Sequence, residues 1–397
     1  EDRSSSLEPL LGTANDTGAS GIDYVQLRVK RTGDNIWWQP GIDFAWADTP
    51  ANAEAAFFTV AQNPGWASWQ VSSAALTADL QSGYQYQFSA RVRDTSGNWS
   101  LPYSTRTTVF DNTPPVSRST FPPTGFFVSV NALPNVRGTM AEFATPGGNV
   151  GQVSRILVQM RSLIDGKYWN PITQGWQGGE YNLDSDAGQV GFNVALGTWA
   201  VTTNIPIAHV KLINGNTYYI ATTAFDDADD IKNQELFHVV TSTFVFDSSA
   251  PITTVGLPKH QDMRSSLASL TGTMEEVPNG VAVTSSGIQG TELTIQRLSP
   301  DDQYWTGSDW GAKTWLAAST VTATSWQMTS GLPVWNHGTT YWIVARSSDK
   351  AANVESISEV LVDSVSVTFD LSGSTIALSN WISTNAAGPY YLNPTIT

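Results

Sequence analysis

The 397-residue chain contains no cysteine, which excludes disulfide bonds, thiol nucleophiles and thiolate metal sites. Charge is also scarce: charged residues make up 14% of the chain, and 20 Lys and Arg stand against 35 Asp and Glu. A surface with a formal net charge of −15 repels phosphate backbones, so nucleic acid is not an expected partner. No apolar run approaches the ~20 residues that a spanning helix needs, so no membrane span is expected in this segment.

Catalytic motifs are missing as well. The four histidines, His209, His238, His260 and His337, are scattered and lack the spacing of a zinc-binding helix. No Gly-x-Ser-x-Gly sequence occurs, so no nucleophile elbow is predicted. The glycine-rich stretch at 147–151 has no lysine to bind a phosphate. We therefore expect a protein that is not an enzyme and requires no cofactor.

A repeated motif dominates what is present. A glycine is followed three residues later by a tyrosine and then, eight residues further on, by an aspartate. The three copies are Gly83, Tyr86 and Asp94; Gly215, Tyr218 and Asp226; and Gly338, Tyr341 and Asp349. Recurrence at a fixed spacing is the signature of a repeat protein. The chain is therefore predicted to contain three copies of one module.

Prolines mark the expected module boundaries, because Pro114-Pro115 and Pro251 follow the ends of predicted last strands. We predict modules at 1–113, 114–249 and 250–365, the second with the longest insertion. Residues 366–397 are expected to be a linker and the first strand of a further module, and this segment is the candidate donor strand. The chain begins with Glu1 rather than Met, as expected of a piece of a longer or processed precursor.

Each module is expected to consist of strands. Val25, Leu27 and Val29 alternate with polar residues, as in a strand with one buried and one wet face. Short strands of this kind, separated by turn residues and without helical periodicity, are typical of a β-sandwich. The predicted fold class is therefore all-β: a tandem array of three immunoglobulin-like β-sandwich modules and the start of a fourth.

The motifs resemble those of a known family. Gly12-Thr13-Ala14, Ser20-Gly21-Ile22, the turn 94–98 and the stretch 111–115 are similar to bacterial immunoglobulin-like (fibronectin type III-like) repeats of giant cell-surface proteins. The resemblance covers nearly the whole chain and implies a structural role. It also implies that Tyr86, Tyr218 and Tyr341 form the tyrosine corner of each sandwich and are structural residues.

Acidic residues gather where we expect neighbouring modules to meet. Ca²⁺ takes six to eight oxygen ligands, largely carboxylates and carbonyls, so these positions are candidate calcium sites. The predicted ligands are Asp16, Asp111, Asp226, Asp227, Asp229 and Asp230 at the first junction, and Glu142, Asp247, Asp349 and Asn353 at the second. The alternative for the Asp-x-x-Gly-Asn copies is a simple turn, in which Asp caps the backbone and Gly adopts the left-handed conformation.

Tryptophans outside the matched positions form a second candidate site. Exposed flat aromatics stack on sugar rings or insert into a neighbouring subunit. The candidate ligand-binding or partner-binding residues are Trp46, Trp66, Trp176, Trp310 and Trp315, all in regions of variable length. The alternative is that they pack within the chain.

The leading hypothesis is a non-catalytic structural segment of a large extracellular bacterial protein that builds a surface layer, sheath, stalk or filament. Its expected location is the cell surface, and its expected partners are other copies of itself or other surface proteins. The alternative is an adhesin or carbohydrate-binding module that uses exposed loop tryptophans on glycans.

Overall fold

The computed structural model describes residues 3–7, 9–18, 20–39, 45–47, 52–129, 133–149, 151–206, 211–228, 231–236, 240–277, 285–357 and 363–375. Strands make up most of the regular structure in these ranges, which confirms the predicted all-β fold. A search of the described helices finds none long and apolar enough to span a membrane.

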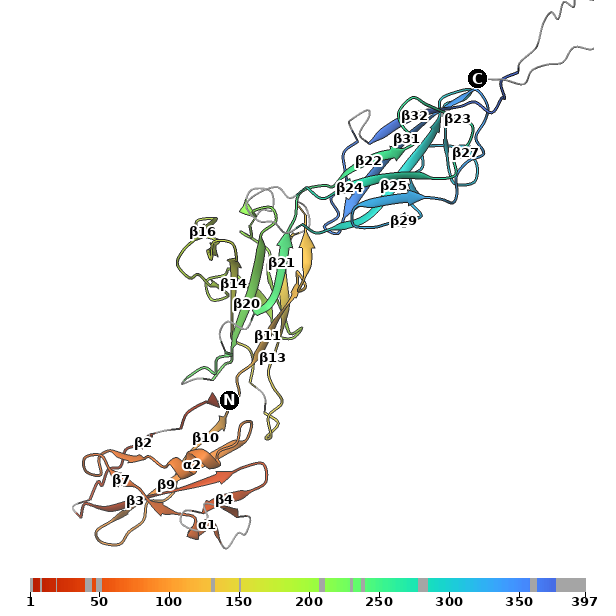
Figure 1. Cartoon of the computed structure of the whole chain (residues 1–397). Coiled ribbons are helices and arrows are strands. Elements are labelled where there is room, and N and C mark those ends of the chain that lie inside the picture. The colour runs from red at the N-terminus through yellow and green to blue at the C-terminus, as the bar shows by residue number, and fades with distance from the viewer. Residues whose placement is uncertain are drawn as a thin grey trace, which may run out of the picture. The chain divides into compact units, whose positions relative to one another are not determined.

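The chain divides into two compact units. The first contains Glu1–Ser249, Val277–Gly287 and Lys350–Asn353, and the second contains Ala250–Glu276, Ile288–Asp349 and Val354–Thr397. Two sandwiches lie in the first unit and one in the second. Each sandwich pairs a large sheet with a small one (Figure 1).

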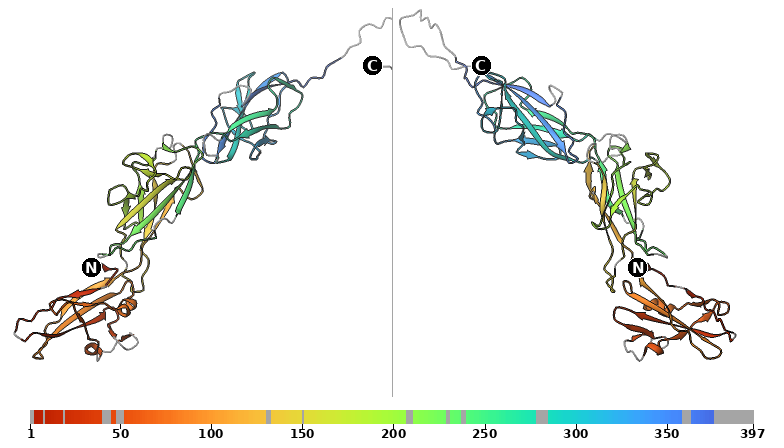
Figure 2. Two further views of the ribbon diagram at one scale, coloured as in Figure 1. Left: turned by 60° about the vertical axis from the view of Figure 1, so that its left-hand side comes forward. Right: turned by 180° about the vertical axis from the view of Figure 1, so that it is seen from behind.

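The first sandwich is drawn in red to orange in Figures 1 and 2. Two short helices, α1 (Asn52–Ala55) and α2 (Ala74–Asp79), lie in its connections. Its large sheet has the order β1 (Arg3–Ser4), β10 (Ser104–Phe110), β9 (Gln85–Asp94), β3 (Ile22–Arg31), β4 (Ile36–Gln39) and β5 (Ala45–Ala47), with β6 (Phe58–Thr59) also paired to β3. Its small sheet has the order β2 (Leu10–Gly12), β8 (Trp69–Val71) and β7 (Ala61–Gln62).

The second sandwich repeats this plan with one additional strand in the small sheet. Its large sheet has the order β12 (Phe126–Val128), β21 (Val240–Phe246), β20 (Thr217–Phe225), β14 (Arg155–Ser162), β15 (Tyr168–Asn170) and β16 (Gly175–Gln177), with β17 (Leu183–Asp184) also paired to β14. Its small sheet has the order β11 (Val116–Phe121), β13 (Val136–Ala141), β19 (Thr198–Val201) and β18 (Gly191–Asn193).

The third sandwich has the same topology as the second. Its large sheet has the order β23 (Asp262–Arg264), β32 (Ser364–Phe369), β31 (Thr339–Asp349), β25 (Ile288–Arg297), β26 (Gln303–Trp305) and β27 (Trp310–Gly311), with β28 (Leu316–Ala317) also paired to β25. Its small sheet has the order β22 (Ile252–Leu257), β24 (Leu270–Glu275), β30 (Ser325–Met328) and β29 (Thr320–Val321).

The last strand of the third sandwich extends beyond residue 365, where the sequence predicts that the module ends. Val365, Val367 and Phe369 of β32 are buried, and β32 pairs with β31. The backbone N–H of Asp370 then donates to the carbonyl of Arg264, 2.9 Å away. Residues 366–369 therefore belong to the third sandwich and not to a linker, and the aspartate that follows its last strand is Asp370. Asp363 precedes β32. The start of this strand is hard to place from the local sequence, because it lies farther from the turn after β31 than the last strands of the other sandwiches lie from theirs.

A buried tyrosine ties each large sheet to the chain that precedes it. The phenol oxygens of Tyr86, Tyr218 and Tyr341 accept hydrogen bonds from backbone N–H groups five residues earlier, at 2.9, 2.7 and 3.0 Å respectively. The three side chains are almost completely inaccessible to solvent. A phenol in an apolar core requires such a partner, because a buried hydroxyl without a hydrogen bond is costly.

Candidate functional site

An acidic cluster lies where the first two sandwiches meet within the first unit. Asp111 follows the last strand of the first sandwich, β10. Asp226 and Asp227 follow β20, and Glu142 follows β13, both in the second sandwich. Ala141 pairs with Val116 at the start of the second sandwich, so β13 ends at the same pole where the chain enters from Asp111.

Backbone amides and an asparagine hold Asp226 in place. One carboxylate oxygen of Asp226 accepts from the backbone N–H groups of Asn233 and Ala228, at 2.8 and 3.2 Å. The other accepts from the Asn233 side-chain amide at 2.5 Å. The same amide nitrogen donates to the carbonyl oxygen of Asp111 at 2.7 Å. Asn233 therefore links the turn of the second sandwich to the end of the first.

Glycine at position 151 lets the chain pass close to two carboxylates. A Cβ atom added to Gly151 would lie 2.9 Å from Oδ1 of Asp227 and 3.0 Å from Oδ2 of Asp111. The next residue, Gln152, donates its backbone N–H to Oδ1 of Asp227 at 3.0 Å. On the Asp111 side, Oδ1 accepts from the hydroxyl of Ser82 at 2.9 Å. The cluster is thus assembled from three separate stretches of chain.

Glu142 is the least satisfied member of the cluster. Its Oε1 atom is buried and has no hydrogen-bond partner among the described residues. Burial, together with the negative charges of Asp226, Asp111 and Asp227, raises the pKa of Glu142 to about 8. Burial also raises the pKa of Asp226, although its hydrogen bonds to Asn233 oppose that shift. Both shifts arise because carboxylates are withdrawn from water beside like charges.

A single guanidinium reaches this cluster among the described residues. Arg3 places Nη1 4.0 Å from Oδ2 of Asp111 and Nε 3.7 Å from Oδ1 of Asp227. The ammonium of Lys232 also lies near the cluster, 3.4 Å from the carbonyl oxygen of Asp226. Two positive charges thus lie near four acidic groups, so neutralisation is incomplete when all are ionised. In the described part of the chain, no three of these four side chains offer oxygens that all lie within 4.8 Å of one another.

No protein-family model matches the sequence, and no curated protein matches it. Among solved structures, the chain is similar to the chicken CNTN1 FN1–FN3 domains, with 13% identity over 91% of this chain and 95% of that chain and a TM-score of 0.31. It is also similar to a tetra-tandem repeat in the extending region of a large adhesion protein, with 14% identity over 91% and 70% of the two chains and a TM-score of 0.25. A third similar structure holds the fibronectin(III)-like modules of CbhA from Clostridium thermocellum, with 11% identity over 66% and 100% and a TM-score of 0.29.

The predicted members of the first junction divide between two places. Asp16 lies at the other end of the first sandwich, where its carboxylate accepts from the N–H groups of Gly18 and Gly21 at 2.8 and 2.7 Å. These bonds lower the pKa of Asp16, and the opposing charge effect comes from Asp94. Asp16 is therefore not brought to Asp111. Asp229 and Asp230 lie outside the described residues.

Strand order explains why Glu142 joins the first cluster and Asp16 does not. From the sequence, the strand that ends at each Gly-Thr pair is predicted to be the first of its sandwich. In the second sandwich, β11 precedes it and runs antiparallel to it, so the loop that carries Glu142 returns to the entry pole. Each additional antiparallel strand reverses the pole at which the next loop lies.

The residues predicted for the second junction belong to both units. In the first unit, Asp247 accepts from the backbone N–H groups of Ser286 at 2.7 Å and Ser249 at 3.1 Å. The Asn353 amide donates to the Asp247 carbonyl oxygen at 2.8 Å. This contact matches the bond from Asn233 to Asp111 described above.

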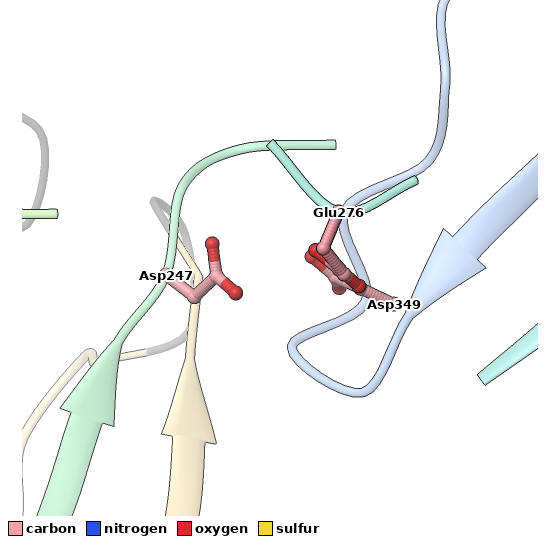
Figure 3. Close-up of side chains that lie close together, drawn as sticks. All are labelled: Asp247, Glu276 and Asp349. Carbon is pink, nitrogen blue, oxygen red and sulfur yellow. The ribbon is translucent and has the colours of Figure 1, made fainter. Parts of the chain in front are cut away.

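The second unit contributes a pair of acidic side chains. Asp349 is buried, and it and Glu276 offer carboxylate oxygens within 4.8 Å of one another. Figure 3 shows the two carboxylates side by side. Glu276 was not among the predicted ligands, although it follows Gly272-Thr273 much as Glu142 follows Gly138-Thr139. That shared position is the sequence signal that could have identified it.

Three of the candidate tryptophans occupy equivalent positions in the three sandwiches. Trp46, Trp176 and Trp310 are half-buried, and their rings lie 5.4, 5.2 and 5.8 Å from those of the corner tyrosines Tyr86, Tyr218 and Tyr341. Each pairs across a hairpin with the matched tryptophan on the preceding strand. Their equivalence is hidden in the sequence because the hairpins differ in length.

The remaining two candidates are also half-buried. Trp66 packs against the core of the first sandwich. The ring of Trp315 lies under the guanidinium of Arg346, 3.9 Å from its centre, and beside the amine of Lys313 at 5.4 Å. Packing within the chain therefore accounts for all five side chains.

Proposed function

We propose that the chain is a non-catalytic structural segment of a large extracellular bacterial protein. Its tandem immunoglobulin-like modules would build a surface layer, sheath, stalk or filament at the cell surface. Its partners would be further copies of the chain or other surface proteins. In this proposal, the first two modules span residues 1–113 and 114–249.

The observation that carries the proposal is the direct attachment of the second sandwich to the first. The backbone N–H of Gly147 donates to the carbonyl of Ser82 at 3.2 Å, and the Asn149 side chain donates to the carbonyl of Gly83 at 2.7 Å. A Cβ on Gly147 would lie 2.1 Å from the carbonyl carbon of Gly83, so only glycine permits this approach. Specific contacts of this kind restrict the motion of one module against the next, as an array that transmits tension requires.

Calcium would complete the attachment. Asp111, Glu142, Asp226 and Asp227 are the proposed ligands at the first junction, with Glu142 assigned there by its position. An ion would neutralise carboxylates that otherwise repel one another across the contact. Asp247, Glu276, Asp349 and Asn353 are proposed for the same role by their equivalent positions in the sequence.

The tryptophans give less support to glycan binding. Trp46, Trp66, Trp176 and Trp310 pack against the cores of their own sandwiches. The observations therefore favour assembly over carbohydrate recognition.

Electron microscopy of the native material, with and without a chelator, tests the proposal. We expect extended assemblies with calcium and shorter or disordered ones after chelation. Single particles under both conditions would contradict an assembly role. Assemblies that do not respond to the chelator would retain the structural function and remove calcium from it.

A further inference from the structure

The small sheets of the second and third sandwiches each end in an edge strand. β11 pairs with β13 on one side, and β22 pairs with β24 on one side. Among the described residues, no strand pairs with the other side of either. Backbone N–H and C=O groups on such a side form a template to which a strand of another molecule can add. The chemistry of these two edges therefore decides whether they are open to further chains.

An apolar groove follows the edge of β11. It has a volume of about 530 Å³, and its lining includes Pro115, Val116, Phe143 and Leu236. The side chains of Phe143 and Leu236 are exposed. A strand that added to β11 could bury apolar side chains in this groove. The shape and apolarity of this surface thus favour the addition of a strand.

A glutamate covers an outward backbone N–H of each edge strand. The N–H of Ser117 in β11 donates to both carboxylate oxygens of Glu235, at 3.0 and 2.9 Å. The N–H of Thr253 in β22 donates to Oε1 of Glu355 at 2.8 Å. In an antiparallel pair, alternate residues direct their N–H and C=O groups away from the partner strand. Ser117 and Thr253 are such residues, because their N–H groups bond to a glutamate and not to the neighbouring strand.

The large sheet holds each carboxylate at that position. The backbone N–H of Ala224 in β20 donates to Oε2 of Glu235 at 3.1 Å, and the backbone N–H of Glu235 donates to the carbonyl oxygen of Ala224 at 3.0 Å. Ser347 in β31 makes the same two bonds with Glu355, at 3.2 and 3.1 Å. Each glutamate therefore connects the two sheets of its sandwich along one side.

The side chains of the two edge residues are engaged as well. The hydroxyl of Ser117 donates to that of Thr222 in β20 at 2.8 Å, and the hydroxyl of Thr253 donates to that of Ser347 in β31 at 2.8 Å. Both edge residues are buried. The edge strand is therefore bonded to the large sheet through its inward hydroxyl, and its outward N–H is covered by the glutamate.

Holding a carboxylate at this position is costly. Burial raises the pKa of Glu355, and its hydrogen bonds from Thr253 and Ser347 oppose that shift. The shift arises because withdrawal from water disfavours the charged form, and a neutral side chain would avoid this cost. The same residue nevertheless makes the same bonds in two sandwiches, which indicates a role other than packing.

We propose that Glu235 and Glu355 close the edges of β11 and β22 to strands of other molecules. Each carboxylate binds the backbone N–H with which an added strand would pair, and it presents a negative charge in place of that donor. The contact is autoinhibitory, because each sandwich blocks the pairing of its own edge and leaves association to other surfaces. The inference goes beyond the proposed function, since these edges stay unpaired whether or not copies of the chain assemble.

Removal of one glutamate from the full-length chain tests the proposal. Glu355→Ala takes away the acceptor of the Thr253 N–H, so in dilute protein this amide should exchange hydrogen at least about ten-fold faster than in the natural chain. At higher concentration, the opened edge should pair with the β22 edge of a second copy. The dissociation constant of self-association in sedimentation should then fall at least about ten-fold, and the Thr253 amide should become protected again.

Two further variants separate edge pairing from loss of stability. A Cβ on Gly272 would meet the backbone of β22 and the indole of Trp326. Gly272→Ala therefore strains the same sandwich but retains Glu355, and it should associate like the natural chain. Ile252 in β22 is exposed. In the Glu355→Ala background, Ile252→Lys should return self-association to the natural level, because a charge on an edge strand opposes pairing.

The second sandwich repeats the test independently. Glu235→Ala should expose the Ser117 amide and promote self-association in the same way. Gly138→Ala is its matched control, because a Cβ there would lie 1.9 Å from the carbonyl oxygen of Arg118 while Glu235 is retained. If one of the two glutamate variants does not fold, the other sandwich decides.

Four results would overturn the proposal. The first is an edge amide that exchanges no faster when its glutamate is removed. The second is a glutamate variant that exposes this amide and still associates only as the natural chain does. The third is a glycine control that associates as strongly as the glutamate variant. The fourth is unfolding of both glutamate variants, which would mean that the glutamates are needed for folding and not for closing an edge.

Discussion

At the scale of single residues, one asparagine joins two sandwiches. Asn233 donates to the carboxylate of Asp226 and to the carbonyl of Asp111 through the same amide nitrogen. Its equivalent in the first sandwich, Asn98, donates to the carboxylate of Asp94 at 2.8 Å. A residue that completes the turn in the first two copies thus also forms the contact between modules in the second.

Asn233→Ala should loosen the contact between the first two sandwiches, because it removes the bond to Asp111 and leaves that carbonyl without it. We expect the amides of Gly147 and Asn149, which donate to the first sandwich, to exchange hydrogen faster than in the natural chain. The loss of stability should be roughly 1–2 kcal/mol. Asn98→Ala removes the equivalent turn bond and should leave the exchange of both amides unchanged. Equal exchange in the two variants would contradict the linking role.

Glu142 makes the stability of the first unit depend on pH. Its pKa is raised from 4.5 to about 8, so folding favours the protonated carboxyl. The stabilisation is complete below pH 4.5 and is lost as the pH rises through about 8. In a chelator, the urea midpoint of the natural chain should therefore fall across this window.

Glu142→Gln should remove this pH-dependent loss of stability. The loss amounts to about 1 kcal/mol in the free energy of unfolding, because solvent screens the partly exposed group. At high pH, calcium should raise the free energy of unfolding of the natural chain by ~2.7 kcal/mol when its concentration is one hundred times the dissociation constant. Calcium should raise the free energy of unfolding of the Glu142→Gln variant much less. A natural chain whose urea midpoint is constant from pH 4.5 to 8 in the chelator would refute this account.

At the scale of elements, a glycine lets two strands and a tryptophan meet in the small sheets of the second and third sandwiches. A Cβ on Gly272 would lie 1.9 Å from the carbonyl oxygen of Thr254 and 2.4 Å from the indole nitrogen of Trp326. Gly138 in the second sandwich has the same surroundings, with the carbonyl of Arg118 at 1.9 Å. The Gly-Thr motif is therefore a packing requirement of the small sheet.

Gly272→Ala should destabilise the third sandwich by about 3 kcal/mol, because neither the backbone of β22 nor the buried indole can move away cheaply. Gly290→Ala in β25 is the matched control, since a Cβ there would meet no atom within 4 Å. It should change the free energy of unfolding by no more than about 1 kcal/mol. Denaturant unfolding of both variants measures the difference, and equal losses would show that the space at Gly272 is not limiting.

At the scale of the whole molecule, each sandwich has a hydrophobic core of its own. The core of the third contains residues from Val255 to Phe369 and none from the other two. Two of the cores lie in the first unit and are likewise separate from one another. Stability is therefore expected to be distributed over the modules, as in other repeat proteins.

The fragment 250–375 should accordingly fold by itself. We expect a single cooperative thermal transition and dispersed amide resonances, because all strands from β22 to β32 are retained. The shorter fragment 250–362 lacks β32 and should fail to give that transition. A cooperative transition in the shorter fragment would mean that β32 is not needed to complete the sandwich.

The sequence by itself determined the strand content, the number of corner tyrosines and the acidic character of the ends of the modules. Alternation along a strand and the G-x-x-Y spacing are local, so Val25, Leu27 and Tyr86 could be placed without knowledge of distant partners. The same holds for the turn at Asp94, whose hydrogen bonds to Asn98 are within five residues.

Only the tertiary structure decided which of these residues meet. Glu142 lies beside Asp111 and Asp226 because an additional strand reverses the direction of the chain. Trp46 and Trp176 occupy equivalent positions because hairpins of different length both bring a tryptophan back to the corner tyrosine. Such contacts depend on strand order and pairing across long separations, and no local pattern records them.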